Sequence, residues 1–290
     1  MKDIVLATEN LKYVYSPGLP FAHVAIDGIS VAFERGELVG IIGHTGSGKS
    51  TLVQHFNGLL KAASGRVLLD GKDIWAPGTQ IKDVRFKVGV CFQYPEHQLF
   101  EETVYKDIAF GPKNMGLSAE EIDCRVREVI AFVGLDESYL EKSPFDLSGG
   151  EKRRVAIAGV MAMKPEVLIL DEPCAGLDPA GRDMLLSLIK SYRETTGSTV
   201  LFVSHSMDDI AKLASKVLVL NGSHVAMYGT VDEVFSHGDE LVEMGLNVPV
   251  VTQILNKLKA RGLDIKTSVY DVERAAQVLA NLAKGGQANA

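Results

Sequence analysis

Eight consecutive residues near the start of the chain have the types and the spacing that bind phosphate. Gly43, His44, Thr45, Gly46, Ser47, Gly48, Lys49 and Ser50 follow the pattern G-x-x-x-x-G-K-[ST]. An apolar run at 38–42 predicts a buried strand before them, and a helix is expected over 50–59. Glycines let the backbone turn its N–H groups toward phosphate oxygens. The motif therefore predicts a nucleotide site, and a glycine-rich turn without a ligand is the disfavoured alternative.

Within this loop, two side chains have separate expected tasks. Lys49 can reach the β- and γ-phosphates and take part in catalysis, and the Ser50 hydroxyl can bind Mg²⁺. Thr51 is expected among the residues that bind the nucleotide.

Two adjacent carboxylates follow a second apolar run, at 167–170. Ligands of open α/β sheets lie at the carboxyl ends of the strands. We expect Asp171 to hold Mg²⁺ through water and Glu172 to orient the attacking water or accept its proton. An acidic turn at the end of a strand is the alternative interpretation.

A second possible anion cradle lies at 147–151. Ser148 is a good helix N-cap, and Gly149 and Gly150 leave backbone N–H groups open at the start of a helix. An ordinary glycine-containing cap is the alternative for this motif taken alone.

Composition limits the classes of function. The chain has 290 residues, of which 46% are hydrophobic, and a net charge of −7. This charge argues against broad nucleic-acid binding, and the apolar run 155–163 is too short to cross a bilayer. Three widely spaced cysteines indicate a reducing compartment, and no signal-peptide pattern is seen, so we expect a cytoplasmic protein.

Strand and helix patterns alternate along the chain. Strands are predicted at 4–8, 23–33, 65–70, 88–92, 199–203, 216–220 and 224–228, in addition to the two runs above. The segment 102–163 is mainly helical, with a capping box at Ser118, and helices are expected over 179–194 and after Thr230. This alternation predicts an α/β fold with a mostly parallel sheet covered on both faces. From about 236 onward, apolar residues recur at helical spacing, at Val251, Ile254, Leu255, Leu258, Val272, Val278, Leu279 and Leu282.

The combined motifs resemble those of ATP-binding cassette (ABC) ATPases over residues 4–235. Leu147 to Glu151 resembles the family's signature motif, and the segment 175–178, which ends in Asp178, resembles its D-loop. Gln93 resembles the Q-loop glutamine, with a part in metal binding and catalysis, and His205 resembles the catalytic switch histidine. Tyr15 resembles the aromatic residue that stacks on adenine, although Tyr13 could take that role. Cys174 departs from the pattern, because the family often has a small hydroxyl residue there.

The resemblance implies a P-loop NTPase fold of the ABC cassette type, with a RecA-like core, an antiparallel β subdomain and an inserted helical subdomain. We expect this nucleotide-binding domain at 1–235, its helical subdomain at about 94–163, and a helical appendage at 236–290. The implied ligands are ATP and Mg²⁺. The implied assembly is a head-to-tail dimer in which Ser148 to Gly150 of one chain close over the nucleotide of the other.

The segment 92–104 is similar to that of energy-coupling factor (ECF) transporter ATPases, in the form of the second of two paralogues. This resemblance implies a sister ABC ATPase, a transmembrane coupling protein and a membrane subunit that captures a vitamin or metal ion. It places the chain at the cytoplasmic face of the membrane, with no nucleic-acid partner expected. Two alternatives stay open: a soluble ABC ATPase for DNA repair or translation, and a nucleotide-sensing module without turnover. The appendage could join the two ATPases or pack on its own domain.

Overall fold

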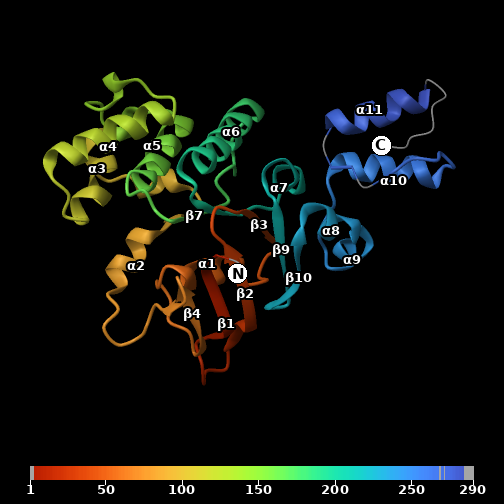
Figure 1. The fold of residues 1–290 in the computed structure, drawn as a ribbon, viewed down its shortest axis with the longest axis horizontal. Coiled ribbons are helices and arrows are strands. Elements are labelled where there is room, and N and C mark those ends of the chain that lie inside the picture. Colours follow the sequence, from red (N-terminus) through yellow and green to blue (C-terminus); the bar gives the residue numbers. More distant parts are fainter. Residues whose placement is uncertain (1–2, 268, 271, 284–290) are drawn as a thin grey trace.

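A parallel sheet forms the centre of the computed structural model, which describes residues 3–267, 269–270 and 272–283 (Figure 1). The ends of the expected domains, 1–2 and 284–290, lie outside the described residues. The sheet has the strand order β10-β9-β3-β8-β7-β6. These strands are β3 (Leu38–Gly43), β6 (Val88–Cys91), β7 (Val167–Asp171), β8 (Thr199–Val203), β9 (Lys216–Asn221) and β10 (His224–Thr230). All neighbours are parallel except β10, which pairs antiparallel with β9. The predicted mostly parallel sheet is confirmed.

Alternate residues of the central strands face two separate hydrophobic cores. Leu168 and Leu170 of β7 pack among the helices of one face, whereas Val167 and Ile169 pack toward the second sheet and helix α1 (Lys49–Phe56). Because successive side chains of a strand point to opposite faces, a strand covered on both faces is apolar throughout. This explains why the runs before Gly43 and Asp171 lack polar alternation.

The second sheet is antiparallel, with the order β2-β1-β4-β5. It consists of β1 (Ile4–Tyr15), β2 (His23–Glu34), β4 (Ser64–Leu69) and β5 (Lys72–Asp73). Strand β1 continues beyond the predicted end at residue 8. Its pairing with β2 shifts register between Thr8 and Leu11, and Asn10 has a φ of 45°. This irregularity interrupts the side-chain alternation on which the prediction depended.

The helical region is inserted between β6 and β7. It contains α3 (Val104–Asn114), α4 (Ala119–Phe132) and α5 (Gly149–Met161), with the short 3-10 turns η1 (Pro95–Gln98), η2 (Glu137–Tyr139) and η3 (Pro144–Asp146). The Ser118 hydroxyl caps α4 by accepting from the Glu121 amide at 3.2 Å, but the Glu121 carboxylate binds Arg125. Helix α2 (Ile81–Lys87), which was not predicted, precedes β6.

The C-terminal part has its own small core. After α6 (Pro179–Thr196) and α7 (Met207–Leu213), helices α8 (Val231–Ser236) and α9 (Gly238–Glu243) still share the core of the central sheet, through residues such as Phe235 and Leu241. Helices α10 (Val250–Ala260) and α11 (Val272–Ala283) instead pack around Val251 and Leu255. We call the elements β1 to α9 the cassette and α10 with α11 the appendage, which projects beyond the cassette in Figure 1. Ile254 and Val272, which share the helical spacing, are 47% and 61% exposed.

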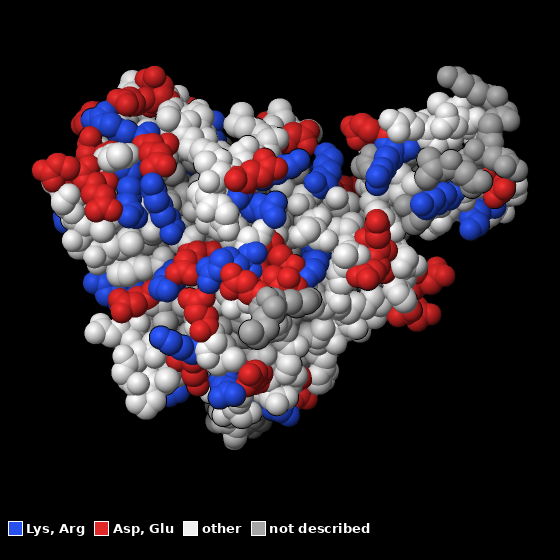
Figure 2. Space-filling model, in the orientation of Figure 1, with Lys and Arg blue, Asp and Glu red and all other residues white. Residues whose placement is uncertain are grey.

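Charges of both signs alternate on the face shown in Figure 2. The described chain also contains ion-pair networks, in one of which Arg35 binds Asp70 at 2.5 Å and Glu166 at 2.8 Å. Among the helices of the described chain, none combines the length and the apolar character that a membrane span requires.

Candidate functional site

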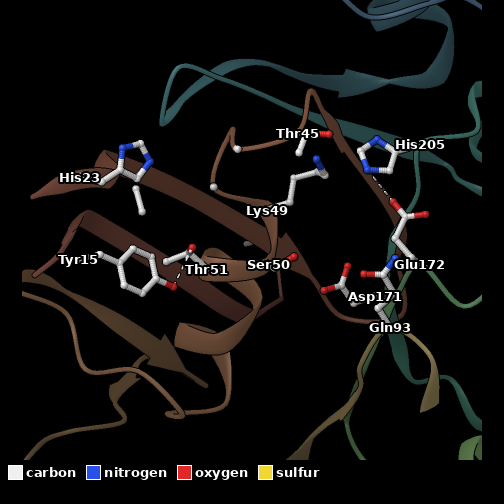
Figure 3. A pocket seen from close by; sticks show the side chains of 13 residues that line it. Tyr15, His23, Thr45, Lys49, Ser50, Thr51, Gln93, Asp171, Glu172 and His205 are labelled. Carbon is white, nitrogen blue, oxygen red and sulfur yellow. Dashed lines mark hydrogen bonds and ion pairs between the residues drawn. The ribbon is translucent and has the colours of Figure 1, made fainter. Parts of the chain in front are cut away.

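A cavity of about 380 Å³ opens where the carboxyl ends of β3, β7 and β8 meet (Figure 3). The P-loop after β3 forms one wall, the acidic residues after β7 form another, and β1 with β2 forms the far end. The lining consists of Tyr15, His23, Ala25, Thr45, Gly46, Gly48, Lys49, Ser50, Thr51, Gln93, Asp171, Glu172 and His205. The fold thus brings together predicted site residues from five separate segments of the chain.

The P-loop is shaped by glycines and by Lys49. Gly48 has a φ of 100°, and a Cβ added there would lie 2.4 Å from the carbonyl oxygen of Ala25. No other residue fits this position without moving the backbone. The Lys49 ammonium donates to the carbonyl oxygens of Gly43 at 2.7 Å and His44 at 3.0 Å. Burial lowers the pKa of Lys49, partly offset by Glu172 and Asp171. The loop therefore curves around a cation, as a phosphate site requires.

Three predicted loop residues do not line this cavity. The Gly43 backbone packs against the Ser47 side chain, since an added Cβ would lie 2.4 Å from Ser47 Oγ. Ser47 is fully buried, and its hydroxyl has no partner within the described part of the chain. The imidazole of His44 lies 2.7 Å from the Thr45 carbonyl oxygen. Ser47 and Gly43 therefore form the floor of the loop, while Thr45, Gly46 and Gly48 face the cavity.

Oxygen donors suited to Mg²⁺ gather beside Lys49. Asp171 ends β7, Ser50 is the second residue of α1, and Gln93 follows β6; all three line the cavity. Burial raises the pKa of Asp171, and the Ser50 hydroxyl and Lys49 counteract this rise. Mg²⁺ prefers oxygen ligands and is often held by one or two carboxylates, with water and substrate phosphates completing the shell. A carboxylate, a hydroxyl and an amide oxygen beside a phosphate loop fit this requirement.

Glu172 has a strained backbone and a perturbed acidity. Its φ is 52°, while its amide still donates to the Val203 carbonyl at 3.0 Å, which holds it next to β8. Such left-handed geometry is unusual for a residue with a side chain and is concentrated at functional sites. Burial raises the pKa of Glu172 to about 7. A carboxylate with a pKa near neutrality is well suited to accept a proton from water.

His205 stands over this carboxylate. Its Nε2 lies 3.3 Å from Glu172 Oε1. The contact is close but not a well-directed hydrogen bond, because Oε1 has no hydrogen-bond partner among the described residues. Burial and the charge of Lys49 lower the pKa of His205. The neutral imidazole therefore dominates at neutral pH and can donate or accept one hydrogen bond.

The end of the cavity formed by β1 and β2 distinguishes the two tyrosines. Tyr15 lines the cavity, and its hydroxyl lies 3.3 Å from Thr51 Oγ1. Tyr13 instead packs on the buried His55, with ring centroids 4.8 Å apart. His23 and Ala25 also line the cavity, although the sequence did not single them out. Tyr15 pairs with His23 across the two antiparallel strands, a contact that no local sequence pattern indicates.

The second predicted cradle lies apart from this cavity. Ser148 and Gly150 line a separate cavity of about 200 Å³. Ser148 and Glu151 form a complete capping box at the start of α5, where Gly149 and Gly150 are exposed. Hydrogen bonds from Ser148 lower the pKa of Glu151 to about 2. Asp178 caps α6 by accepting from the Gly181 amide at 2.7 Å. None of Ser148, Gly149, Gly150 and Asp178 is among the residues that line the cavity around Lys49.

The departure at Cys174 leaves an unreactive thiol near the site. Burial raises the pKa of Cys174 to about 12, so the protonated form dominates at neutral pH. Since the thiolate is the nucleophilic form, burial makes Cys174 a poor nucleophile at neutral pH.

Known proteins resemble this chain over nearly its whole length. A family model described as "ABC transporter" matches residues 26–175. The energy-coupling factor transporter ATP-binding protein EcfA2 of Clostridium acetobutylicum is 53% identical over 92% of this chain and 94% of its own. The protein of that name from Clostridioides difficile is 50% identical over 97% of this chain and 98% of its own.

Solved structures give the same likeness. The structure of cbiO1 from Clostridium perfringens, described as part of the ABC transporter complex cbiONQ, superposes with a TM-score of 0.75 at 39% identity, covering 88% of this chain and 100% of its own. The dimeric post-hydrolysis ATP-binding cassette MJ0796, bound to ADP and Pi, superposes with a TM-score of 0.70 at 26% identity, covering 78% of this chain and 98% of its own.

Proposed function

Because the chain belongs to the ABC transporter family, and within it to the energy-coupling factor transporter ATP-binding proteins, we propose that it hydrolyses ATP to drive an importer for a vitamin or a transition-metal ion. One observation carries the chemistry: the P-loop, Asp171, Glu172 and His205 line a single cavity. A module that only senses nucleotide has no need of a carboxylate whose pKa is tuned to about 7.

Each residue of the cavity has a separate role in hydrolysis, which follows from its position. Lys49 and the loop amides bind the phosphates, and Tyr15 stacks on the adenine. Ser50, Asp171 and Gln93 would hold Mg²⁺, which would neutralise charge on the phosphates. Glu172 orients the attacking water and accepts its proton, while His205, 3.3 Å from that carboxylate, contacts the terminal phosphate. Phosphoryl transfer depends mainly on such positioning and charge stabilisation.

A head-to-tail pair of ATPases completes each site. Gly149 and Gly150 are exposed at the start of α5, and Ser148 and Gly150 line a different cavity from Lys49. They close over the nucleotide bound by a sister ABC ATPase, and Asp178 lies on the same interface. Closure excludes water and strengthens each phosphate contact. The similarity to the dimeric, ADP-bound MJ0796 cassette supports this arrangement.

A groove between α3 and α4 is the proposed docking site for the transmembrane coupling protein. Its volume is about 560 Å³, and its lining includes Tyr105, Phe110 and Ile122. Phe100 and Phe110 form an edge-to-face pair 5.0 Å apart and are 59% and 45% exposed. Paired exposed aromatics beside a groove are typical of a surface that receives an amphipathic helix. The occupant is a cytoplasmic helix of the coupling protein, which also carries the substrate-capture subunit, so the chain lies peripherally on the cytoplasmic face.

Affinity capture from detergent-solubilised native membranes tests this function, followed by ATP-driven uptake in vesicles. We expect the chain to bring down a second cassette ATPase and a multi-span membrane protein. A Phe110→Ser variant should retain the sister ATPase but lose the membrane protein. Recovery of a soluble homodimer alone, or of DNA or ribosomes, would leave ATP hydrolysis in place and refute transport.

A further inference from the structure

A buried arginine joins two loops that the proposed mechanism treats separately. Arg153 lies on α5 and is 4% exposed. Its Nε and Nη2 donate to the two carboxylate oxygens of Glu96, at 3.0 and 2.6 Å. Glu96 belongs to η1, which begins right after Gln93 and Tyr94 and ends two residues before Phe100. This bidentate pair therefore fixes the segment that leads into the proposed docking groove.

The same guanidinium also holds the chain that follows the general base. Arg153 Nη1 donates to the carbonyl oxygens of Pro173 at 3.0 Å and Ala175 at 2.6 Å. The loop 173–178 starts directly after Glu172 and ends at Asp178, in the predicted dimer interface. One planar, rigid group thus contacts the docking segment with two nitrogens and the catalytic loop with the third.

A second arginine continues the connection toward the switch histidine. Arg182, in the first turn of α6, donates to Asp209 Oδ1 at 2.7 Å and to the Ser206 hydroxyl. Ser206 directly follows His205, and the Asp209 side chain is only 3% exposed. The loop 173–178 is therefore held at its start by Arg153 and just beyond its end by Arg182.

We propose that Arg153 is a positioning residue that moves the loop 173–178 together with the docking segment 94–100, so that a partner bound in the groove adjusts Glu172 and Asp178. This inference rests on the proposed function, because the partner is the proposed coupling protein. The pair is bidentate, with Arg153 buried and the Glu96 side chain 15% exposed, so its two segments separate only by leaving the charge of Arg153 unpaired in the interior. They consequently move as one unit, while the exposed Phe100 and Tyr94 remain free to meet the partner.

The informative variant is Glu96→Gln. It keeps an acceptor for one arginine nitrogen and does not alter the acceptors at Pro173 and Ala175, but it removes the charge that ties η1 to Arg153 and holds the guanidinium in place. The matched control is Glu128→Gln, which breaks an exposed ion pair with Lys164 (2.7 Å) in the same helical subdomain. If the Arg153–Glu96 pair only stabilises the fold, both variants should change the stability of the chain and nothing else.

Two measurements separate this inference from the proposed function. In the isolated ATPase, hydrogen exchange at 173–178 should be at least about threefold faster in Glu96→Gln than in wild type, and unchanged in Glu128→Gln. In the assembled transporter, Glu96→Gln should lower the ratio of complex-bound to isolated kcat at least about fivefold while the KM for ATP stays constant. Unchanged exchange, an unchanged ratio, or an equal effect of Glu128→Gln would overturn the role of Arg153. A wild-type chain that no membrane partner binds would instead refute the proposed function, and the exchange result would still decide whether Arg153 links the two loops.

Discussion

Glu172 and His205 face each other because β7 and β8 are neighbouring parallel strands in register, with Asp171 paired to Val203. Each residue lies just beyond the carboxyl end of its strand, and their side chains approach to 3.3 Å at the cavity in Figure 3. The register of the sheet thus sets the distance between the Glu172 carboxylate, the proposed proton acceptor, and the imidazole of His205. This geometry makes the role of Glu172 open to direct test.

Glu172→Gln should slow ATP turnover by roughly 10²–10⁴-fold, the usual contribution of a general base. The amide is nearly the same size but cannot accept a proton from water. ATP should still bind, and a closed ATPase dimer should accumulate, which size-exclusion chromatography with ATP would detect. Turnover at the wild-type rate would contradict the assignment of Glu172 as the base.

The rate of hydrolysis should fall as the pH drops below neutrality. The base works only when ionised, and burial raises the pKa of Glu172 to about 7. We therefore expect kcat/KM to rise with pH and to level off above an apparent pKa near 7. The measurement is a pH–rate profile at saturating Mg²⁺. In Glu172→Gln the residual activity should not show this fall in rate at low pH.

The same raised pKa predicts a pH-dependent gain in stability for Glu172→Gln. Above pH 7 the carboxylate is ionised in both the folded and unfolded states, and the folded state bears the cost of burying the charge. Below the unfolded pKa of 4.5 both states are protonated and this cost vanishes. The variant should thus melt several degrees higher than wild type at pH 8, and the difference should shrink toward pH 5. Calorimetry without nucleotide would measure it, and an equal difference at both pH values would contradict the pKa.

Separate replacement of Tyr15 and Tyr13 in β1 should distinguish a role in nucleotide binding from a role in packing of the fold. Stacking of a base on an aromatic ring contributes about 1–3 kcal/mol, so Tyr15→Ala should raise the KM for ATP roughly 5- to 150-fold. Tyr13→Ala should lower the melting temperature instead, because that ring packs on His55. Equilibrium nucleotide binding and thermal unfolding of both variants check this. A larger loss of binding in Tyr13→Ala would assign adenine stacking to Tyr13.

Local sequence predicted the parts of the site that depend on one strand and its following loop. The P-loop after β3, the acidic pair after β7 and His205 after β8 each follow a continuous apolar run, and a strand with both faces covered leaves that signal directly in the sequence. Gln93 follows the β6 run in the same way, but its role was assigned by the resemblance to ABC ATPases, because a lone glutamine after a strand indicates little.

The remainder depends on contacts between distant segments, which no local pattern contains. His23 and Ala25 reach the cavity only through the antiparallel register of β1 and β2, which a bulge near Asn10 disturbs. Ile254 and Val272 share the spacing of Leu255 but lie outside the appendage core, because the packing of α10 on α11 decides which apolar positions are covered. The pair of Arg153 with Glu96 joins α5 to η1, and neither partner has a neighbour in sequence that indicates the other.

The separate core of the appendage has a consequence for unfolding experiments. Val251 and Leu255 belong to a cluster distinct from both cores of the cassette. A segment with few contacts to the main core opens as its own cooperative unit, at a lower free energy than global unfolding. The chain's single tryptophan, Trp75, lies in the cassette beside Lys61. Intrinsic tryptophan fluorescence therefore does not detect early melting of the appendage, whereas the circular dichroism of its helices does. The unfolding transitions measured by the two methods will not coincide.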